Sequence, residues 1–134
     1  MYEWTNALTV GVPAFDKAHQ QLFSYFDDFH TAMLEGKSKD QISSILDRTQ
    51  AYTKQHFDSE EKWLAGKNDP DLINHKAQHR KFQEQIATFI KENNAGKIGL
   101  SGVISKTLRE WLGGHIMQID QQYAKRYNTN SKPL

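Results

Sequence analysis

The residues of this chain that could do chemistry are histidines and acids spaced like metal ligands. Five of the six histidines, with one glutamate and one aspartate, form four separate groups. These groups are His19, His56 with Glu60, His75 with His79, and His115 with Asp120. Imidazole and carboxylate together suit iron, zinc, manganese or copper, and seven such ligands are more than one ion needs. The pattern therefore predicts a site for two metal ions.

Spacing within the groups predicts how the side chains point. His75 and His79 are four residues apart, so they share one face of a helix and could hold one ion together. Each such pair is common by chance when it occurs alone. His115 and Asp120 are five residues apart, which separates them by roughly 140° around an ideal α-helix. We therefore expect Asp120 to approach from another side than His115, reaching between the two ions.

Amphipathic patterns predict the elements that position these groups. Apolar residues recur at steps of three and four over four segments, at about residues 15–34, 40–65, 70–93 and 101–127. Asp69 is expected to cap the third helix, with Pro70 as its first residue. Short loops make neighbouring helices antiparallel. The prediction is one all-α domain over residues 1–134, an up-down-up-down four-helix bundle with an N-terminal arm packed outside it.

The depth of each group along its helix supports the metal interpretation. His19 is near the start of the first helix, and the other groups are near the end of the second, the start of the third and the end of the fourth. In an alternating bundle these places meet at one end of the core. Burying so many unpaired polar groups would cost several kcal/mol each if they were ionised. Metal binding is therefore favoured over five separately hydrogen-bonded core histidines, although a lone histidine would carry no such argument. The sixth histidine, His30, is too far along its helix to join, and Asp16 is expected to be a helix cap.

Composition narrows the class of protein. The net charge is +1, from 17 basic and 16 acidic residues, so no nucleic-acid partner is expected. There is no cysteine, which excludes thiolate metal sites, iron–sulfur clusters and disulfides. No signal pattern or membrane-spanning apolar stretch is present, so we expect no membrane insertion and a cytoplasmic location. Glu-x-x-His and His-Glu-x-x-His are both absent, which argues against a ferritin-type carboxylate site and a zinc protease.

The residues around the seven candidates resemble a single-domain bacterial hemerythrin from about Tyr2 to Tyr123. The matching segments are Trp4 with Gly11-Val12-Pro13-Ala14-Phe15-Asp16-x-x-His19, His56-Phe57-x-x-Glu60-Glu61, His75-x-x-x-His79-x-x-Phe82, and Trp111-Leu112-x-x-His115-Ile116-x-x-x-Asp120. The chain departs from the family at Asn68-Asp69, where a tyrosine is frequent, and at Met117, where leucine is frequent. Neither departure affects a candidate ligand.

The resemblance implies a cofactor and a division of the ligands. Two non-haem iron ions would be bridged by Glu60, Asp120 and an oxo or hydroxo group. One iron would be completed by three histidines and the other bound by two, leaving a position where O2 enters. The three are His75, His79 and His115, and the two are His19 and His56. Apolar neighbours are hypothesised to exclude water from the O2 pocket, namely Trp111, Ile116, Met117 and Ile119.

The implied function is reversible O2 binding for carriage, storage or local delivery to an oxygen-using enzyme, by a monomer that is not itself an enzyme. Three alternatives stay open at this point. The ferrous pair could act as a redox enzyme on nitric oxide or peroxide, the chain could be a sensor of O2 or iron, or it could handle iron or zinc.

Overall fold

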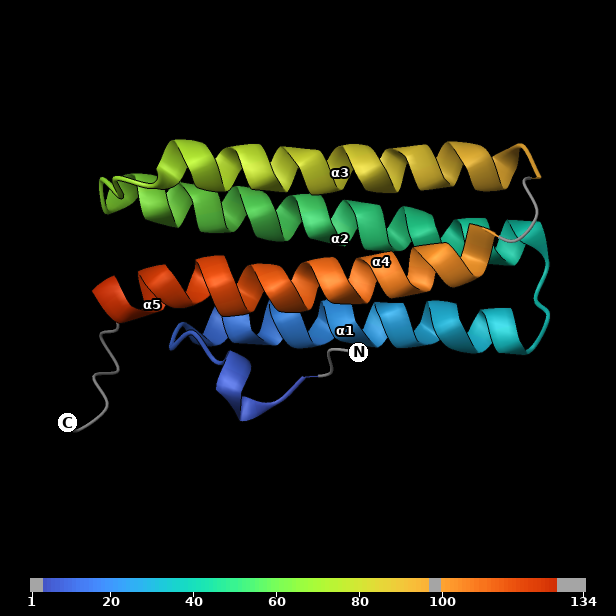
Figure 1. The fold of residues 1–134 in the computed structure, drawn as a ribbon, viewed down its shortest axis with the longest axis horizontal. Coiled ribbons are helices and arrows are strands. Elements are labelled where there is room, and N and C mark those ends of the chain that lie inside the picture. Colours follow the sequence, from blue (N-terminus) through green and yellow to red (C-terminus); the bar gives the residue numbers. More distant parts are fainter. Residues whose placement is uncertain (1–3, 97–99, 128–134) are drawn as a thin grey trace.

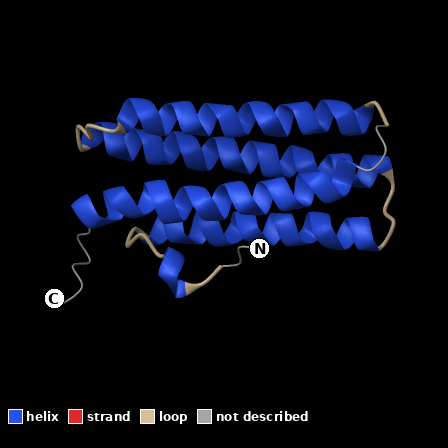
Figure 2. Ribbon diagram, viewed as in Figure 1, coloured by secondary structure: helices blue, strands red, loops and turns tan. Residues whose placement is uncertain are grey.

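Four antiparallel helical rods make up the protein in this computed structural model (Figure 1), which describes residues 4–96 and 100–127, the side chains of 100–105 excepted. The first three rods are α1 (Pro13–Leu34), α2 (Lys39–Gly66) and α3 (Leu72–Asn94). The fourth joins α4 (Leu100–His115), a π-helical turn η2 (Ile116–Asp120) and α5 (Gln121–Tyr127). Figure 2 shows helices and loops, with no strand in the part of the chain that is described. The predicted all-α four-helix bundle is confirmed.

Local sequence signals explain where the first two helices begin. Pro13 is the first residue of α1, where its fixed φ suits a helical turn and its missing N–H costs nothing. Ser38 caps α2 through a capping box: its Oγ accepts from the N–H of Gln41 at 3.2 Å, and Gln41 Oε1 accepts from the N–H of Ser38 at 2.9 Å. Both helices therefore begin slightly earlier than the periodicity predicts.

The start of α3 differs from the prediction. The helix begins at Leu72 rather than Pro70, and its N-cap is Asp71, which makes no side-chain capping bond. Asp69 is not the cap, because its carboxylate is used elsewhere. Its Oδ1 accepts from the N–H of Asp71 at 2.8 Å, and its two oxygens accept from Arg126 of α5 at 3.0 and 2.8 Å. Asp69 thus ties the α2–α3 loop to the last helix.

The N-terminal arm is more deeply packed than its sequence suggests. It contains a short 3-10 turn, Asn6–Leu8, and lies beside α1 (Figure 1). Leu8 and Val10 are only 3 % and 1 % exposed and belong to the hydrophobic core. Asp16 holds the arm: its Oδ1 accepts from the N–H of Val10 at 2.8 Å. The prediction that Asp16 caps the first helix is wrong, since the N-cap is Val12.

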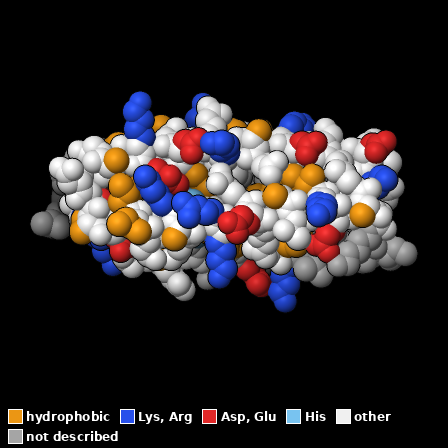
Figure 3. All heavy atoms as spheres, turned by 90° about the horizontal axis from the view of Figure 1, so that it is seen from above, with side chains coloured by type: hydrophobic (Ala, Val, Ile, Leu, Met, Phe, Trp, Pro, Cys, Tyr) orange, Lys and Arg blue, Asp and Glu red, His pale blue; other side chains and the backbone are white. Residues whose placement is uncertain are grey.

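Apolar side chains fill the bundle away from the end where the candidate ligands were predicted to meet. Rings and branched side chains from all four rods are almost completely buried there, among them Leu22, Phe26, Phe29, Leu46, Ile86 and Leu108. On the outer face seen in Figure 3, lysine, arginine and acidic side chains are interspersed. None of the described helices is both long enough and apolar enough to cross a bilayer.

Candidate metal centre

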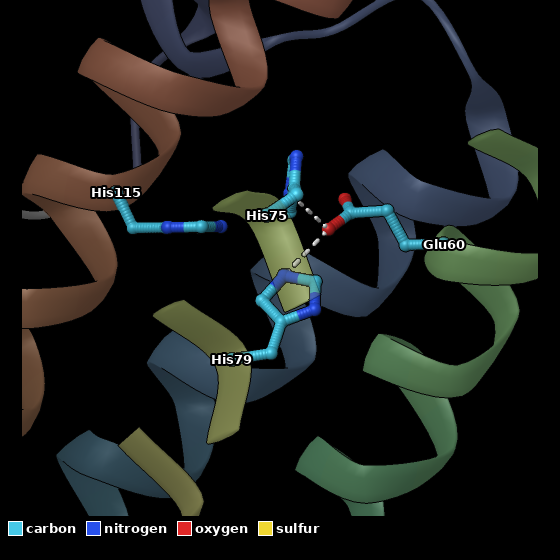
Figure 4. Close-up of side chains that lie close together, drawn as sticks. All are labelled: Glu60, His75, His79 and His115. Atoms are coloured by element: carbon cyan, nitrogen blue, oxygen red, sulfur yellow. Dashed lines mark hydrogen bonds and ion pairs between the residues drawn. The ribbon is translucent and has the colours of Figure 1, made fainter. Parts of the chain in front are cut away.

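All seven predicted ligands lie together inside the bundle, and none is more than 5 % exposed. They come from every rod: His19 from α1, His56 and Glu60 from α2, His75 and His79 from α3, His115 from α4, and Asp120 from the π turn. Figure 4 shows Glu60 and three of the histidines converging from α2, α3 and α4. His30 is half-buried and belongs to neither ligand group described below.

Glu60 lies between two sets of histidines. Its Oε1 is 3.0 Å from Nε2 of His75 and 3.0 Å from Nε2 of His79. Its Oε2 faces the other way, at 3.8 Å from Nε2 of His19 and 3.6 Å from Nε2 of His56. One carboxylate therefore presents one oxygen to each set, as a ligand shared by two ions would.

Asp120 divides its oxygens in the same manner. Oδ1 is 3.0 Å from Nε2 of both His75 and His115, and Oδ2 is 3.3 Å from Nε2 of His19. The candidate ligand atoms form two groups, and within each group all atoms lie within 4.8 Å of one another. One group is Glu60 with His75, His79 and His115, and the other is Glu60 with His19 and His56. Asp120 belongs to neither group by that distance, yet it contacts histidines of both.

The π-helical turn explains how Asp120 reaches this position. In a π turn the backbone bonds span five residues, so side chains five apart lie one above the other. His115 and Asp120 have this spacing across η2, and Nε2 of His115 is 3.0 Å from Oδ1 of Asp120. The expectation that the two side chains approach from different sides is therefore wrong, because it assumed regular α-helix.

Several buried atoms of the cluster have no hydrogen-bond partner among the described residues. They are Nδ1 and Nε2 of His19, Nε2 of His56, His79 and His115, and both oxygens of Asp120. Buried polar atoms are normally satisfied, and leaving them unpaired is costly. Apart from Nδ1 of His19, which is on the outer side of its ring, these nitrogens and oxygens face the carboxylates and histidines of the cluster and would gain partners from a pair of cations. The residues present therefore fit a two-metal site.

Charges inside the cluster are strongly coupled. Burial lowers the pKa of His56 to about 4. Burial acts in the same direction on His75, but the adjacent carboxylates of Asp120 and Glu60 outweigh it and raise the pKa of His75 to about 10. Burial would raise the pKa of Asp120, but contacts with His115 and other histidines hold it well below its usual range. Ionised carboxylates are thus paired with histidine protons that a metal would displace.

Aromatic rings enclose the cluster. The ring of Phe57 stacks on His79 with centroids 3.7 Å apart, and the ring of Trp111 stacks on His115 at 4.5 Å. Tyr123 is fully buried, and its hydroxyl donates to Oε2 of Glu60 at 2.7 Å. The apolar periodicity of the fourth segment does not reveal this hydrogen bond.

Two polar residues to which the sequence analysis gave no role contact the outer nitrogens of histidines. Oε2 of Glu61 is 2.7 Å from Nδ1 of His79. Oε1 of Gln78 is 3.2 Å from Nδ1 of His115. Each residue directly adjoins a candidate ligand in the chain, and Glu61 also belongs to a segment that matches the family.

The hypothesised apolar wall needs one correction. Ile116 is fully buried and Trp111 packs on His115, whereas Met117 is 44 % exposed. The π turn directs Ile116 and Asp120 inward, which leaves Met117 on the outside. Met117 therefore does not line a pocket at the cluster. A separate cavity of about 190 Å³ between α1 and α2 reaches His56, lined also by Phe15, Ala18, Tyr52, Gln55 and Ser59.

Fold and site together define a four-helix bundle of the cation-binding class. Residues 10–127 match the family model described as the hemerythrin HHE cation binding domain, and the chain belongs to the hemerythrin family. The family resemblance seen in the sequence is thereby confirmed.

Relatives of known name support the assignment. The chain is 30 % identical to a bacteriohemerythrin of Methylococcus capsulatus over 121 residues, covering 90 % of this chain and 92 % of that protein. It is 26 % identical to a myohemerythrin of Theromyzon tessulatum, covering 91 % and 90 % of the two chains. A crystal structure of wild-type hemerythrin matches with a TM-score of 0.87 and 28 % identity, over 96 % of this chain and 99 % of the other.

Proposed function

We propose that this protein binds O2 reversibly at a pair of non-haem iron ions. The main support is the position of the Glu60 carboxylate between two sets of histidines. Its Oε1 faces His75 and His79, and its Oε2 faces His19 and His56. Membership of the hemerythrin family supports iron and O2 over the other metals and ligands that such residues suit. A ferrous pair held here supplies the electrons that reversible binding of O2 requires.

The ligands proposed for the two ions are unequal in number. The first ion would be held by His75, His79 and His115, and the second by His19 and His56, with Glu60 and Asp120 shared. Fewer protein ligands at the second ion leave room for an external small molecule. Cavities adjoin both histidine groups, since one of about 190 Å³ reaches His56 and one of about 250 Å³ reaches His115.

The surrounding residues supply orientation and exclusion of water. The hydrogen bond from Tyr123 fixes the rotamer of Glu60, so that each oxygen keeps its own histidine set. Phe15 and Phe57 pack against His56 at ring-centroid distances of 5.7 and 5.8 Å. Rings at these positions limit the access of water and protons to the bound ligand, which favours release of O2 unchanged. The monomeric state, the cytoplasmic location and an oxygen-using partner enzyme stay predictions from the sequence.

The test is an optical titration of reduced, iron-loaded protein under inert gas, with iron counted on the same sample. We expect colour to develop on adding O2, at two irons per chain, and to vanish when O2 is removed over repeated cycles. Colour that forms once and decays to a ferric state that inert gas does not reverse would contradict the carrier proposal and favour a redox enzyme or sensor.

A further inference from the structure

The outer nitrogens of the candidate ligands have unequal partners. Nδ1 of His79 contacts a carboxylate, Oε2 of Glu61, at 2.7 Å. Nδ1 of His115 contacts a neutral amide oxygen, Oε1 of Gln78, at the longer distance of 3.2 Å. Nδ1 of His19 is buried with no hydrogen-bond partner. Of these three histidines, His79 has the strongest acceptor behind it.

Glu61 is well placed to hold the imidazole ring of His79 in one orientation. Its side chain is 21 % exposed, so solvent weakens its contact with His79 only in part. Consecutive residues of α2 contact both nitrogens of one imidazole, because Glu60 Oε1 is 3.0 Å from Nε2 of His79 and Glu61 lies on Nδ1. Phe57, stacked on the same ring with planes 2° apart, fixes the ring plane. The orientation of His79 is therefore constrained on three sides.

We propose that Glu61 is a positioning residue that makes His79 a stronger imidazole donor than His115 or His19. A carboxylate accepting from Nδ1–H fixes the tautomer that leaves the lone pair of Nε2 for the metal, and it raises the basicity of that nitrogen. Glu61 accordingly strengthens the binding of the ion held by His79 and leaves the ion held by His19 and His56 unaffected. This inference rests on the two-metal site of the proposed function.

The experiment compares Glu61→Gln and Glu61→Ala with wild type in a Zn²⁺ titration against a chromophoric chelator. Asp58→Asn is the matched control, because Asp58 is an exposed acid of α2 that pairs with Lys54 at 2.8 Å and loses the same charge. We expect Glu61→Ala to weaken one of two bound Zn²⁺ by about 10–100-fold. Glu61→Gln, which keeps an acceptor oxygen, should weaken it less, and Asp58→Asn should match wild type.

Equal effects of Glu61→Gln, Glu61→Ala and Asp58→Asn would overturn the inference, since a general loss of charge would then explain them. Loss of both Zn²⁺ ions alike in Glu61→Ala would overturn it too. Nitrogen-15 NMR of Zn²⁺-loaded protein gives an independent readout. His79 should be protonated on Nδ1 in wild type and in Glu61→Gln, and a wild-type His79 lacking that proton would refute the role of Glu61.

Gln78→Glu provides the converse test. A carboxylate at position 78 would stand behind His115 as Glu61 stands behind His79, so the variant should tighten Zn²⁺ binding. Unchanged or weaker binding by Gln78→Glu would count against an outer-carboxylate mechanism. None of these titrations involves O2. Two bound Zn²⁺ with irreversible oxidation of the iron form would refute the proposed function alone, and unaltered affinity in Glu61→Ala would refute the role of Glu61 alone.

Discussion

His115 and Asp120 face each other across one π-helical turn, with Nε2 and Oδ1 3.0 Å apart. A spacing of five residues would separate these side chains by roughly 140° on an α-helix. The π turn brings them onto one face and places Asp120 between the two histidine groups. π-helical turns are rare and frequently occur at functional sites. The irregular segment of the fourth rod is therefore part of the metal centre rather than a defect of the bundle.

Moving the carboxylate to the position that an α-helix would favour should abolish its role. In the double variant Ile119→Asp/Asp120→Ile the acid is four residues from His115, but the π turn no longer directs it at both groups. We expect two-metal binding to be lost in a stoichiometric Zn²⁺ titration. Met117→Gln, in the same turn but 44 % exposed, is the control and should bind as wild type. Retention of two ions at wild-type affinity by the double variant would contradict the importance of the π turn.

Removing the Tyr123 hydroxyl should destabilise the metal-free protein. The hydroxyl is buried and donates to ionised Glu60 at 2.7 Å, and hydrogen bonds to charged groups contribute about 1.5–3 kcal/mol. Tyr123→Phe should lower the free energy of unfolding by this amount in chemical denaturation. Tyr25→Phe is the control, because it removes a hydroxyl from a partly buried tyrosine whose ring packs on Tyr52. Equal losses in the two variants would contradict a specific bond to Glu60.

The Asp69–Arg126 pair should matter for stability rather than for metal binding. Asp69 is 1 % exposed at its side chain and Arg126 is 34 % exposed, so the pair is only partly screened. We expect Asp69→Asn to cost about 1–2 kcal/mol of unfolding free energy, between the values for exposed and buried pairs. Asp71→Asn, at the N-cap without a capping bond, should cost less. A stable Asp69→Asn protein that binds metal poorly would reverse this assignment.

Metal removal should lower the stability of the whole bundle, because the candidate ligands join all four rods. A ligand that binds only the folded state stabilises it by about 2.7 kcal/mol per site when its free concentration is 100 times Kd. Thermal unfolding with Zn²⁺, and again with excess chelator, measures the difference. Glu60→Ala should show a much smaller response, since it removes the shared carboxylate. A melting temperature that metal leaves unchanged in wild type would argue against a site spanning the bundle.

The sequence predicted the bundle and the meeting of its histidines for one physical reason. Buried faces of long helices impose a period of 3.6 residues, and His19, His56 and His79 occupy positions within that period. Once the helices alternate in direction, the depth of each histidine follows from its distance to the nearest loop. The structure brings these side chains together as that argument requires.

Features that depend on irregular backbone or on a single contact were not predictable in this way. A π turn changes the register within a helix without interrupting its apolar pattern, so Asp120 was assigned the wrong direction. Met117, hypothesised as part of the pocket wall, is 44 % exposed. Asp69 satisfied the sequence rule for an N-cap, but an ion pair with a residue 57 positions away uses its carboxylate. Glu61 lies in a segment that matches the family, but its contact with His79 is evident only once the neighbouring helix is in place.

A crystal structure of the iron-loaded protein, with anomalous data at the iron edge, tests most directly whether Glu60 and Asp120 share two metal ions. We expect two anomalous peaks per chain inside the bundle. One should contact His75, His79 and His115, the other His19 and His56, and both should contact the two carboxylates. A single peak, or two peaks that Glu60 does not join, would contradict a two-metal centre shared by these carboxylates.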